Sequence, residues 1–179
     1  MSAPAAARRH LDLLVVGAGP AGRRAAITAA HLGARTAIAD RGPGPTGLLP
    51  FRALHAAAGD AIAARRARPL RGGERPPDLA DLLWRADRLV EGQRDAVRDQ
   101  LRRERVEVLE GAARLTGPHE VDIDGPRGTA RLTADRIVIA TGGVPRRPPG
   151  CDRDGRLVMA PEDLPSLPRL PGRLTVVGA

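Results

Sequence analysis

The sequence predicts an α/β fold in which a parallel central sheet carries a small antiparallel insert. Three observations lead to this prediction. An apolar run at residues 11–16 is followed by a glycine-rich turn, a helical stretch and a second apolar run at residues 35–40. A further apolar run occupies residues 137–140. Between the second and the last run, residues 113–133 hold three short strand-like segments, which predict the insert.

The first elements form one strand–helix–strand unit. A buried strand is predicted at residues 11–16, a helix from Pro20 to Leu32 and a second strand at residues 35–40. Gly33 stands where a glycine commonly ends a helix. Because strand–helix–strand connections within one sheet are right-handed and join parallel strands, the two strands are expected to lie parallel.

Two more helices are predicted from their starting residues. A Gly- and Pro-rich loop at residues 41–49 precedes an Ala-rich helix that starts near Pro50. Asp78 is a candidate cap for a long helix that runs to about Arg105. Its apolar residues recur at helical spacing on one stripe, with Trp84 predicted to pack at the edge of that stripe. The stripe consists of Leu79, Leu82, Leu83, Ala86, Val90, Val97 and Leu101.

Short strands are predicted in the remaining sequence. They cover residues 106–110, 113–116, 120–124, 129–133 and 137–140, and the GPRG sequence from Gly125 to Gly128 supplies a turn. Residues 143–150 are Pro-rich and mark a candidate boundary, after which LTVVGA at residues 174–179 predicts one more strand.

Composition narrows the classes of function. The 179 residues suffice for about one domain of roughly 150 residues. The net charge is 29 − 21 = +8, yet every basic residue is Arg, so GC-rich coding explains the charge as well as an anionic partner does. Aromatic residues make up 1% of the chain, which argues against modules that stack single-stranded nucleic acid. We therefore expect no specific nucleic-acid partner.

Other features set expectations about location and chemistry. No apolar run approaches the roughly 18 residues that span a bilayer, and the N-terminus lacks a secretory h-region. We therefore expect a cytoplasmic protein with no membrane partner. The four histidines lack metal-ligand spacing, so no metal site is predicted. The single cysteine, Cys151, excludes an intramolecular disulfide, and no catalytic residue is assigned.

The strongest motif is G-A-G-P-A-G at Gly17–Gly22. It follows a predicted strand, opens a predicted helix and precedes an acid, Asp40, which ends the second strand 18 residues after Gly22. This context is typical of a dinucleotide-binding fingerprint. Gly17 permits the tight turn, Gly19 lets the backbone approach a pyrophosphate, and Gly22 lets helix and strand pack closely. The motif alone does not separate FAD from NAD.

Beyond the motif, the sequence resembles the pyridine nucleotide-disulfide oxidoreductase family over nearly its whole length. Within that family it is most similar to the soluble, Si-specific NAD(P)+ transhydrogenases, above all in the stretch from Ala80 to Val121 with its VRDQLRRERV core. The IVIATG sequence, in which Ala140–Gly142 would return to the cofactor, is shared by the family. The resemblance implies a Rossmann-like FAD/NAD(P)-binding domain built of three layers, two of β-strands and one of helices (ββα).

The resemblance also implies residue roles. FAD contacts are implied at Gly17, Ala18, Gly19, Pro20, Ala21, Gly22, Asp40 and Arg41, and at the backbone of Ala113, Thr141 and Gly142. Arg52 aligns with the family's flavin-proximal lysine and would supply positive charge there. The implied activity is hydride exchange between NADPH and NAD through FAD, with NAD(P)H as the substrate partner of the full-length family.

Two departures from the family pattern shape these expectations. The loop at residues 41–52 is shortened and carries no cysteine, so a dithiol relay is excluded there, whereas hydride exchange needs no thiol. We expect residues 1–148 to form the FAD-binding domain and residues 149–179 to begin a truncated nicotinamide-binding domain. Turnover by this chain alone is not expected, and a homo-oligomer is left open.

Three alternatives stand beside this hypothesis. The first is a dihydrolipoyl dehydrogenase-like flavoprotein, which the missing cysteines disfavour. The second is a degenerate, non-catalytic nucleotide-binding remnant. The third is a basic DNA-associated protein, for which the net charge is the motivation.

Overall fold

The computed structural model describes residues 9–42, 49–67, 78–143, 150, 152, 154–169 and 171–177. The chain divides into two compact units. The first comprises residues 1–47 and 92–143, and the second comprises residues 48–91 and 144–179. Cys151 and residues 43–48 of the shortened loop lie outside the described residues. The functional division expected at residue 148 stays a prediction.

The first unit contains a six-stranded mixed sheet, which confirms the predicted α/β fold. Its spatial order is β3-β2-β1-β6-β5-β4. Neighbours among β3, β2, β1 and β6 run parallel, and β6, β5 and β4 form an antiparallel meander. The strands are β1 (Arg9–Val16), β2 (Thr36–Asp40), β3 (Glu107–Glu110), β4 (Ala112–Leu115), β5 (Glu120–Gly125) and β6 (Gly128–Ile139).

The helices begin where the sequence predicts. Helix α1 spans Pro20–His31, α2 spans Leu49–Ala67 and α3 spans Leu79–Arg103. At the start of α3 the backbone N–H of Asp81 donates to the Asp78 carboxylate, and the N–H of Asp78 donates to the Asp81 carboxylate, both at 3.0 Å. This reciprocal capping satisfies amides that the first turn leaves without partners. A short 3-10 helix covers Pro161–Ser166.

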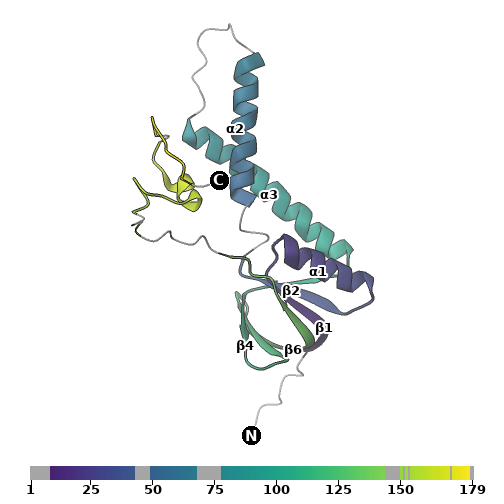
Figure 1. Cartoon of the computed structure of the whole chain (residues 1–179). Coiled ribbons are helices and arrows are strands. Elements are labelled where there is room, and N and C mark those ends of the chain that lie inside the picture. Colours follow the sequence, from purple (N-terminus) through teal and green to yellow (C-terminus); the bar gives the residue numbers. More distant parts are fainter. Residues whose placement is uncertain are drawn as a thin grey trace. The chain divides into compact units, whose positions relative to one another are not determined.

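Two apolar clusters give the first unit three layers. On one face of the parallel strands, Val15 and Ile38 pack with Ala26 of α1 and with Val97 and Leu101 of α3. On the other face, residues of β1 and β2 pack against the meander; these are Leu11, Leu14, Ala37, Ala39, Val121, Ile123, Leu132 and Ala134. Figure 1 shows α1 on one side of the sheet and the meander strands on the other. The arrangement is the predicted ββα layering.

The meander turns back over the sheet at a sharp corner. Strands β3 and β4 are consecutive, with Gly111 between them. The Gly111 N–H donates to the Asp40 carbonyl at 2.7 Å, which joins the corner to the end of β2. A Cβ at Gly111 would lie 2.7 Å from the carbonyl oxygen of Asp124, so this corner leaves room for glycine alone.

Strand β6 differs from the prediction. Residues 129–133 and 137–140 were expected to form separate strands, whereas a single strand runs from Gly128 to Ile139. Between the two expected strands, Asp135 and Arg136 have exposed side chains and continue the backbone ladder. The strand instead changes partners: it pairs with β5 up to Thr133 and with β1 from residue 132 to 139.

The second unit holds α2, the first part of α3 and the C-terminal segment. Ala53 of α2 packs with Ala86 and Val90 of α3 in a small apolar cluster. Most of the predicted α3 stripe is buried, but Trp84 is 63% exposed, with the Arg88 guanidinium 5.5 Å from its ring centroid. Trp84 therefore lies beyond the edge of the stripe, where a cation–π contact covers one ring face.

Residues 174–177 do not form the predicted strand. Their backbone carries no strand assignment, and Leu174, Val176 and Val177 are exposed. A strand exists only through hydrogen bonds to a neighbour. None of the helices in the described residues combines the length and apolar character needed to cross a membrane.

Replacing Gly111 with alanine is expected to destabilise the fold by about 1–3 kcal/mol, because the new Cβ overlaps the β5 backbone. Gly92, inside α3, is the matched control, since no heavy atom lies within 4 Å of a Cβ built there. Alanine favours a helix interior by roughly 0.5–1 kcal/mol over glycine. The urea midpoint should fall for Gly111→Ala and rise for Gly92→Ala. An unchanged midpoint for Gly111→Ala would contradict the tight corner.

Candidate functional site

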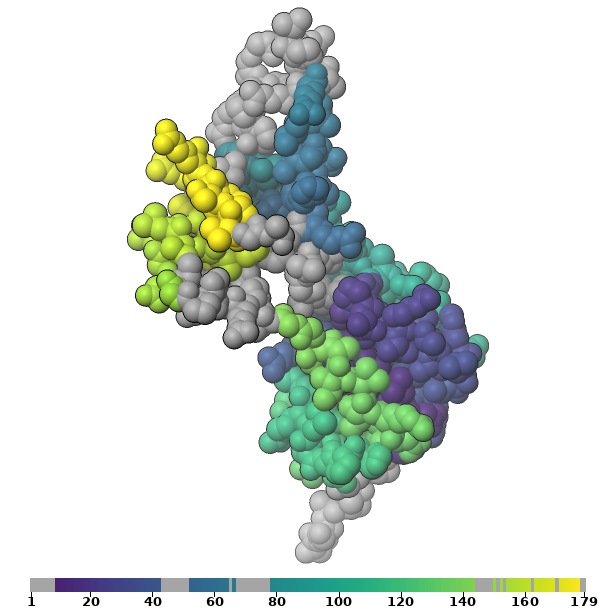
Figure 2. All heavy atoms as spheres, viewed as in Figure 1, coloured from purple at the N-terminus to yellow at the C-terminus, as the bar shows by residue number. Residues whose placement is uncertain are grey.

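The glycine-rich turn joins β1 to α1 through close backbone contacts. Gly17 adopts φ = +106°, and its N–H donates to the Ala39 carbonyl at 2.7 Å. A Cβ at Gly17 would overlap the Ala140 carbonyl, and a Cβ at Gly22 would overlap the Gly17 carbonyl. Gly17 and Gly22 are therefore required by the packing of β1, α1 and the end of β6. Figure 2 shows the purple α1 region adjoining the green segment of β6.

Gly19 differs from its two neighbours in the motif. The nearest heavy atom to a Cβ built there is the Ala140 carbonyl oxygen, at 4.0 Å, so no other described residue fills the space beside it. Gly19 is also the N-cap of α1, which has no side-chain cap and no acidic residue in its first turn. The free amides of a helix start and its positive dipole end favour an anion there. The turn therefore fits a ligand phosphate.

Asp40 connects two loops at the end of β2. Its Oδ2 accepts a hydrogen bond from the Ala18 N–H at 2.7 Å, and its Oδ1 accepts one from the Gly42 N–H at 3.2 Å. The first bond reaches from the end of β2 into the glycine-rich turn, and it fixes the carboxylate beside the start of α1. Carboxylate oxygens have further lone pairs that can accept from ribose hydroxyls.

The end of β6 lies against the same turn. The Ala140 N–H donates to the Val16 carbonyl at 2.7 Å, and a Cβ at Gly17 would lie 3.0 Å from the Thr141 Cα. Thr141 and Gly142 follow β6 and are exposed. The predicted residues at Gly17–Gly22, Asp40 and Thr141–Gly142 therefore meet at the carboxyl edge of the parallel strands, the edge at which α/β sheets bind ligands.

The remaining predicted residues are placed as follows. Arg41 directly follows Asp40 and is exposed. Ala113 is half-buried in β4 and contacts the meander-side cluster, two residues beyond the corner that is bonded to the Asp40 carbonyl. Arg52 is exposed on α2, in the second unit. Their predicted contacts with FAD stay predictions.

One residue at this edge was missed by sequence reasoning. Ile139, the last residue of β6, is 66% exposed, although its apolar run predicted a buried strand. Apolarity alone gave no signal, because the other residues of the run, Ile137, Val138 and Ala140, are equally apolar and are half-buried.

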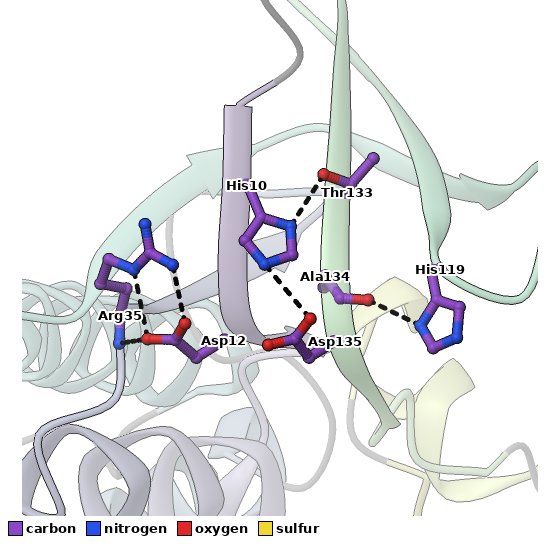
Figure 3. Close-up of polar contacts among 7 residues, drawn as sticks. All are labelled: His10, Asp12, Arg35, His119, Thr133, Ala134 and Asp135. Atoms are coloured by element: carbon purple, nitrogen blue, oxygen red, sulfur yellow. Dashed lines mark hydrogen bonds and ion pairs between the residues drawn. The ribbon is translucent and has the colours of Figure 1, made fainter.

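A separate polar cluster lies near the start of β1, at the opposite end of the parallel strands (Figure 3). Asp12 accepts three hydrogen bonds from Arg35: from Nη2 at 2.8 Å, from Nε at 3.2 Å and from the backbone N–H at 2.6 Å. His10 of β1 lies between two residues of β6, Thr133 with Oγ1 at 3.1 Å and Asp135 with Oδ1 at 3.2 Å.

Ligand-capable atoms of His10, Asp12 and Asp135 all lie within 4.8 Å of one another. However, Arg35 already donates to both oxygens of Asp12, which neutralises that carboxylate. The cluster is accounted for as an ion-pair network that joins β1, β6 and the start of β2.

Comparisons with known proteins agree on one family. The sequence profile described as pyridine nucleotide-disulphide oxidoreductase matches residues 11–179. A soluble pyridine nucleotide transhydrogenase of Mycobacterium bovis (strain BCG / Pasteur 1173P2) is 36% identical over 96% of this chain and 39% of its own length. A dihydrolipoyl dehydrogenase of Chlorobaculum tepidum is 33% identical over 94% of this chain and 38% of its own length.

A solved structure extends the likeness to the fold. LpdA of Mycobacterium tuberculosis superposes with a TM-score of 0.69 and 25% identity, over 89% of this chain and 37% of that chain. The chain thus spans about two fifths of the length of the curated relatives it matches, 39% for the M. bovis protein.

The Asp12–Arg35 pair predicts an acid dependence. The pKa of Asp12 is lowered from 3.8 to about 2, first by the hydrogen bond from the Arg35 side chain and next by that from its backbone N–H. Because the folded-state pKa lies below the unfolded one, this contribution to stability is complete above pH 3.8 and is lost as the pH falls toward 2. Arg35→Gln should raise the Asp12 pKa toward 3.8, as measured by carboxyl-carbon NMR titration.

Arg127→Gln, in the β5–β6 turn, is the matched control and should leave the Asp12 titration unchanged. An Asp12 pKa that stays near 2 in Arg35→Gln would show that the guanidinium is not its cause.

Proposed function

The chain belongs to the pyridine nucleotide-disulphide oxidoreductase family, and we propose that its glycine-rich turn binds FAD in a protein related to the soluble pyridine nucleotide transhydrogenases. The observation that carries the proposal is the geometry around Gly19. The protein's own backbone fills the space beside Gly17 and Gly22. Beside Gly19, at the start of α1, no described residue lies closer than 4.0 Å to a built Cβ, and the helix has no side-chain cap. The 36% identity to a named transhydrogenase supports the finer assignment.

Each part of the site has a role toward the cofactor. The first-turn amides of α1 would donate to the pyrophosphate, and Gly19 would admit it close to the backbone. Asp40 would accept hydrogen bonds from the hydroxyls of the adenosine ribose, while its bond to the Ala18 N–H holds the turn in place. Thr141 and Gly142 would contact the other half of the dinucleotide, because they end β6 on the side of β1 away from β2.

When bound, FAD supplies a ring that accepts a hydride from one nicotinamide and passes it to another. The described residues bind and orient that cofactor. For the whole family, NAD(P)H is the proposed substrate. The transhydrogenase proposal adds that hydride passes between NADPH and NAD.

The alternative within the family is a dihydrolipoyl dehydrogenase-like activity. The 33% identity to the C. tepidum relative supports it. That chemistry oxidises a dithiol substrate and passes its electrons to the flavin through a pair of cysteines. The stretch after β2, residues 41–52, contains no cysteine, and the whole sequence has one. Hydride exchange needs no thiol, so the cysteine count favours the transhydrogenase-like proposal.

The test of the proposal is FAD binding, measured by quenching of flavin fluorescence and by retained absorbance after gel filtration. The protein should bind FAD, and Gly19→Ala should weaken binding tenfold or more, since a methyl group would occupy the place of the phosphate (about 1.4 kcal/mol per tenfold). The backbone at Gly19, φ −64° and ψ 175°, suits alanine, so the ligand-free fold should be unaffected.

Gly92→Ala serves as the matched control and should bind FAD like the wild type. A wild-type protein that gains no flavin absorbance would refute the proposal. Equal FAD affinity in Gly19→Ala and wild type would show that the flavin binds elsewhere.

A second measurement addresses the activity. Hydride transfer from NADPH to thio-NAD+ would be followed spectrophotometrically with FAD present. We expect FAD binding without turnover, because the described residues hold one glycine-rich dinucleotide turn and the reaction uses a nicotinamide as well. Turnover would exclude the non-catalytic remnant as an explanation. Steeply salt-dependent DNA binding, tighter than that of a generic basic protein, would favour the DNA-associated alternative instead.

A further inference from the structure

Helix α3 carries a glycine near the middle of its length, and that glycine has no packing role. Gly92 is exposed, and no heavy atom lies within 4 Å of a Cβ built there. It does not adopt a positive φ, so the backbone conformation does not require glycine either. Glycine weakens a helix interior because it gives the chain more freedom to leave the helical conformation. Gly92 is the one glycine in α3, so the helix backbone is weakest at this turn.

The apolar stripe of α3 is interrupted at the same turn. Buried apolar residues recur every three or four positions up to Val90 and again from Val97, with none between these two. Arg94 occupies the position of the stripe inside this gap. Its side chain is half-buried, and its Nε is buried without an acceptor among the described residues. A buried donor without a partner costs free energy, which is recovered when the turn opens and water reaches the donor.

The two halves of α3 are anchored in separate apolar clusters. Ala86 and Val90 pack with residues of α2, whereas Val97 and Leu101 pack with residues of β1 and β2. The boundary between the two compact units falls directly before Gly92. Because helices in proteins are stabilised mainly by the packing of their apolar face, each half of α3 is stabilised by a different cluster.

The ion pairs along α3 follow the same division. Side chains three residues apart support the stretch of helix that they bridge. Among the described residues, each such pair of α3 lies wholly before or wholly after Gly92. The pairs are Arg88–Glu91, Asp95–Arg98 and Asp99–Arg102. The turn at Gly92 therefore receives no support from these pairs.

We propose that α3 bends at the turn formed by residues 91–94, so that its two halves move as separate bodies. Four observations meet at this turn: a glycine without a packing role, a gap in the apolar stripe, a change of anchoring cluster and ion pairs that stop on either side. The hinge lets α2 and the first half of α3 reorient together, while the second half keeps its packing on the sheet. The inference does not rest on the proposed FAD site, whose residues all lie outside α3.

Hydrogen exchange of the full chain tests the hinge. In a continuous helix the amides of residues 93–96 donate to the carbonyls of residues 89–92. After correction for intrinsic rates, we expect these amides to exchange at least tenfold faster than those of residues 98–101, because the turn opens locally. Gly92→Ala should slow exchange at residues 93–96 about two- to fivefold, since alanine favours the helical backbone.

Gly59→Ala is the matched control. Gly59 is an exposed interior glycine of α2, and no heavy atom lies within 4 Å of a Cβ built there. Its replacement gives the same gain in helix propensity at a different place, so exchange at residues 93–96 should stay as in the wild type. Equal slowing by Gly59→Ala and Gly92→Ala would overturn the inference, because exchange would then report unfolding of the whole chain.

The distance between two spin labels measures the bending itself. Labels would be attached through Arg85→Cys and Gln100→Cys, two exposed positions on either side of the turn, in a Cys151→Ser background. A straight helix separates these positions by about 22 Å along its axis. The distance distribution should be broad and extend to shorter values, and Gly92→Ala should narrow it. A narrow single distance without Gly92→Ala overturns the inference, and so does slow exchange at residues 93–96 or an exchange rate that Gly92→Ala leaves unchanged.

Discussion

The candidate site depends on the close approach of three backbone segments: the end of β1, the start of α1 and the end of β6. They approach so closely that Cβ atoms at Gly17 and Gly22 would overlap neighbouring carbonyl groups. Because Gly17 and Gly22 lack side chains, α1 begins directly above the carboxyl edge of the sheet with its amide groups directed outward. The open face of Gly19 exists only because its two neighbours in the motif are packed this tightly. The phosphate site proposed at this turn would therefore be a consequence of helix–sheet packing.

Those elements were predictable because local chemistry fixes them. The glycine spacing in the turn, the acid that ends β2 and the reciprocal cap at Asp78 and Asp81 all act within a few residues or through one strand–helix–strand unit. The apolar stripe of α3 was also predictable, because helical spacing of apolar residues is visible within the helix sequence itself. Each of these signals lies in the sequence near the residues that it describes.

The parts that escaped prediction depend on partners distant in the sequence. Strand β6 continues through Asp135 and Arg136 because β1 supplies hydrogen bonds where β5 ends, and a polar dipeptide gives no hint of that exchange. Residues 174–177 have the composition of a strand, but they do not pair with any described strand. Ile139 is as apolar as its half-buried neighbours Val138 and Ala140, and it lies beyond the point where β5 stops pairing with β6. The same reasoning applies to Trp84, whose exposure depends on which part of α3 is covered.

Several of the many arginines form ion pairs with nearby carboxylates. The buried carboxylate of Asp122 lies between the guanidinium groups of Arg114 and Arg131 on the neighbouring strands, at 3.4 and 3.3 Å. Arg35 is engaged with Asp12, and Arg9 with Glu107. These pairs are spread over the strands and do not gather at the glycine-rich turn. The positive net charge is therefore not concentrated at the proposed site, where backbone amides would be the phosphate donors.

The acid at the end of β2 narrows which dinucleotide suits the turn. A carboxylate that faces a ribose accepts hydrogen bonds from free hydroxyls and repels a 2′-phosphate. Asp40 is held in that position by the Ala18 N–H and cannot swing away without breaking a 2.7 Å hydrogen bond. At the proposed site this carboxylate would disfavour NADP(H) on electrostatic grounds, which would leave FAD and NAD as candidates.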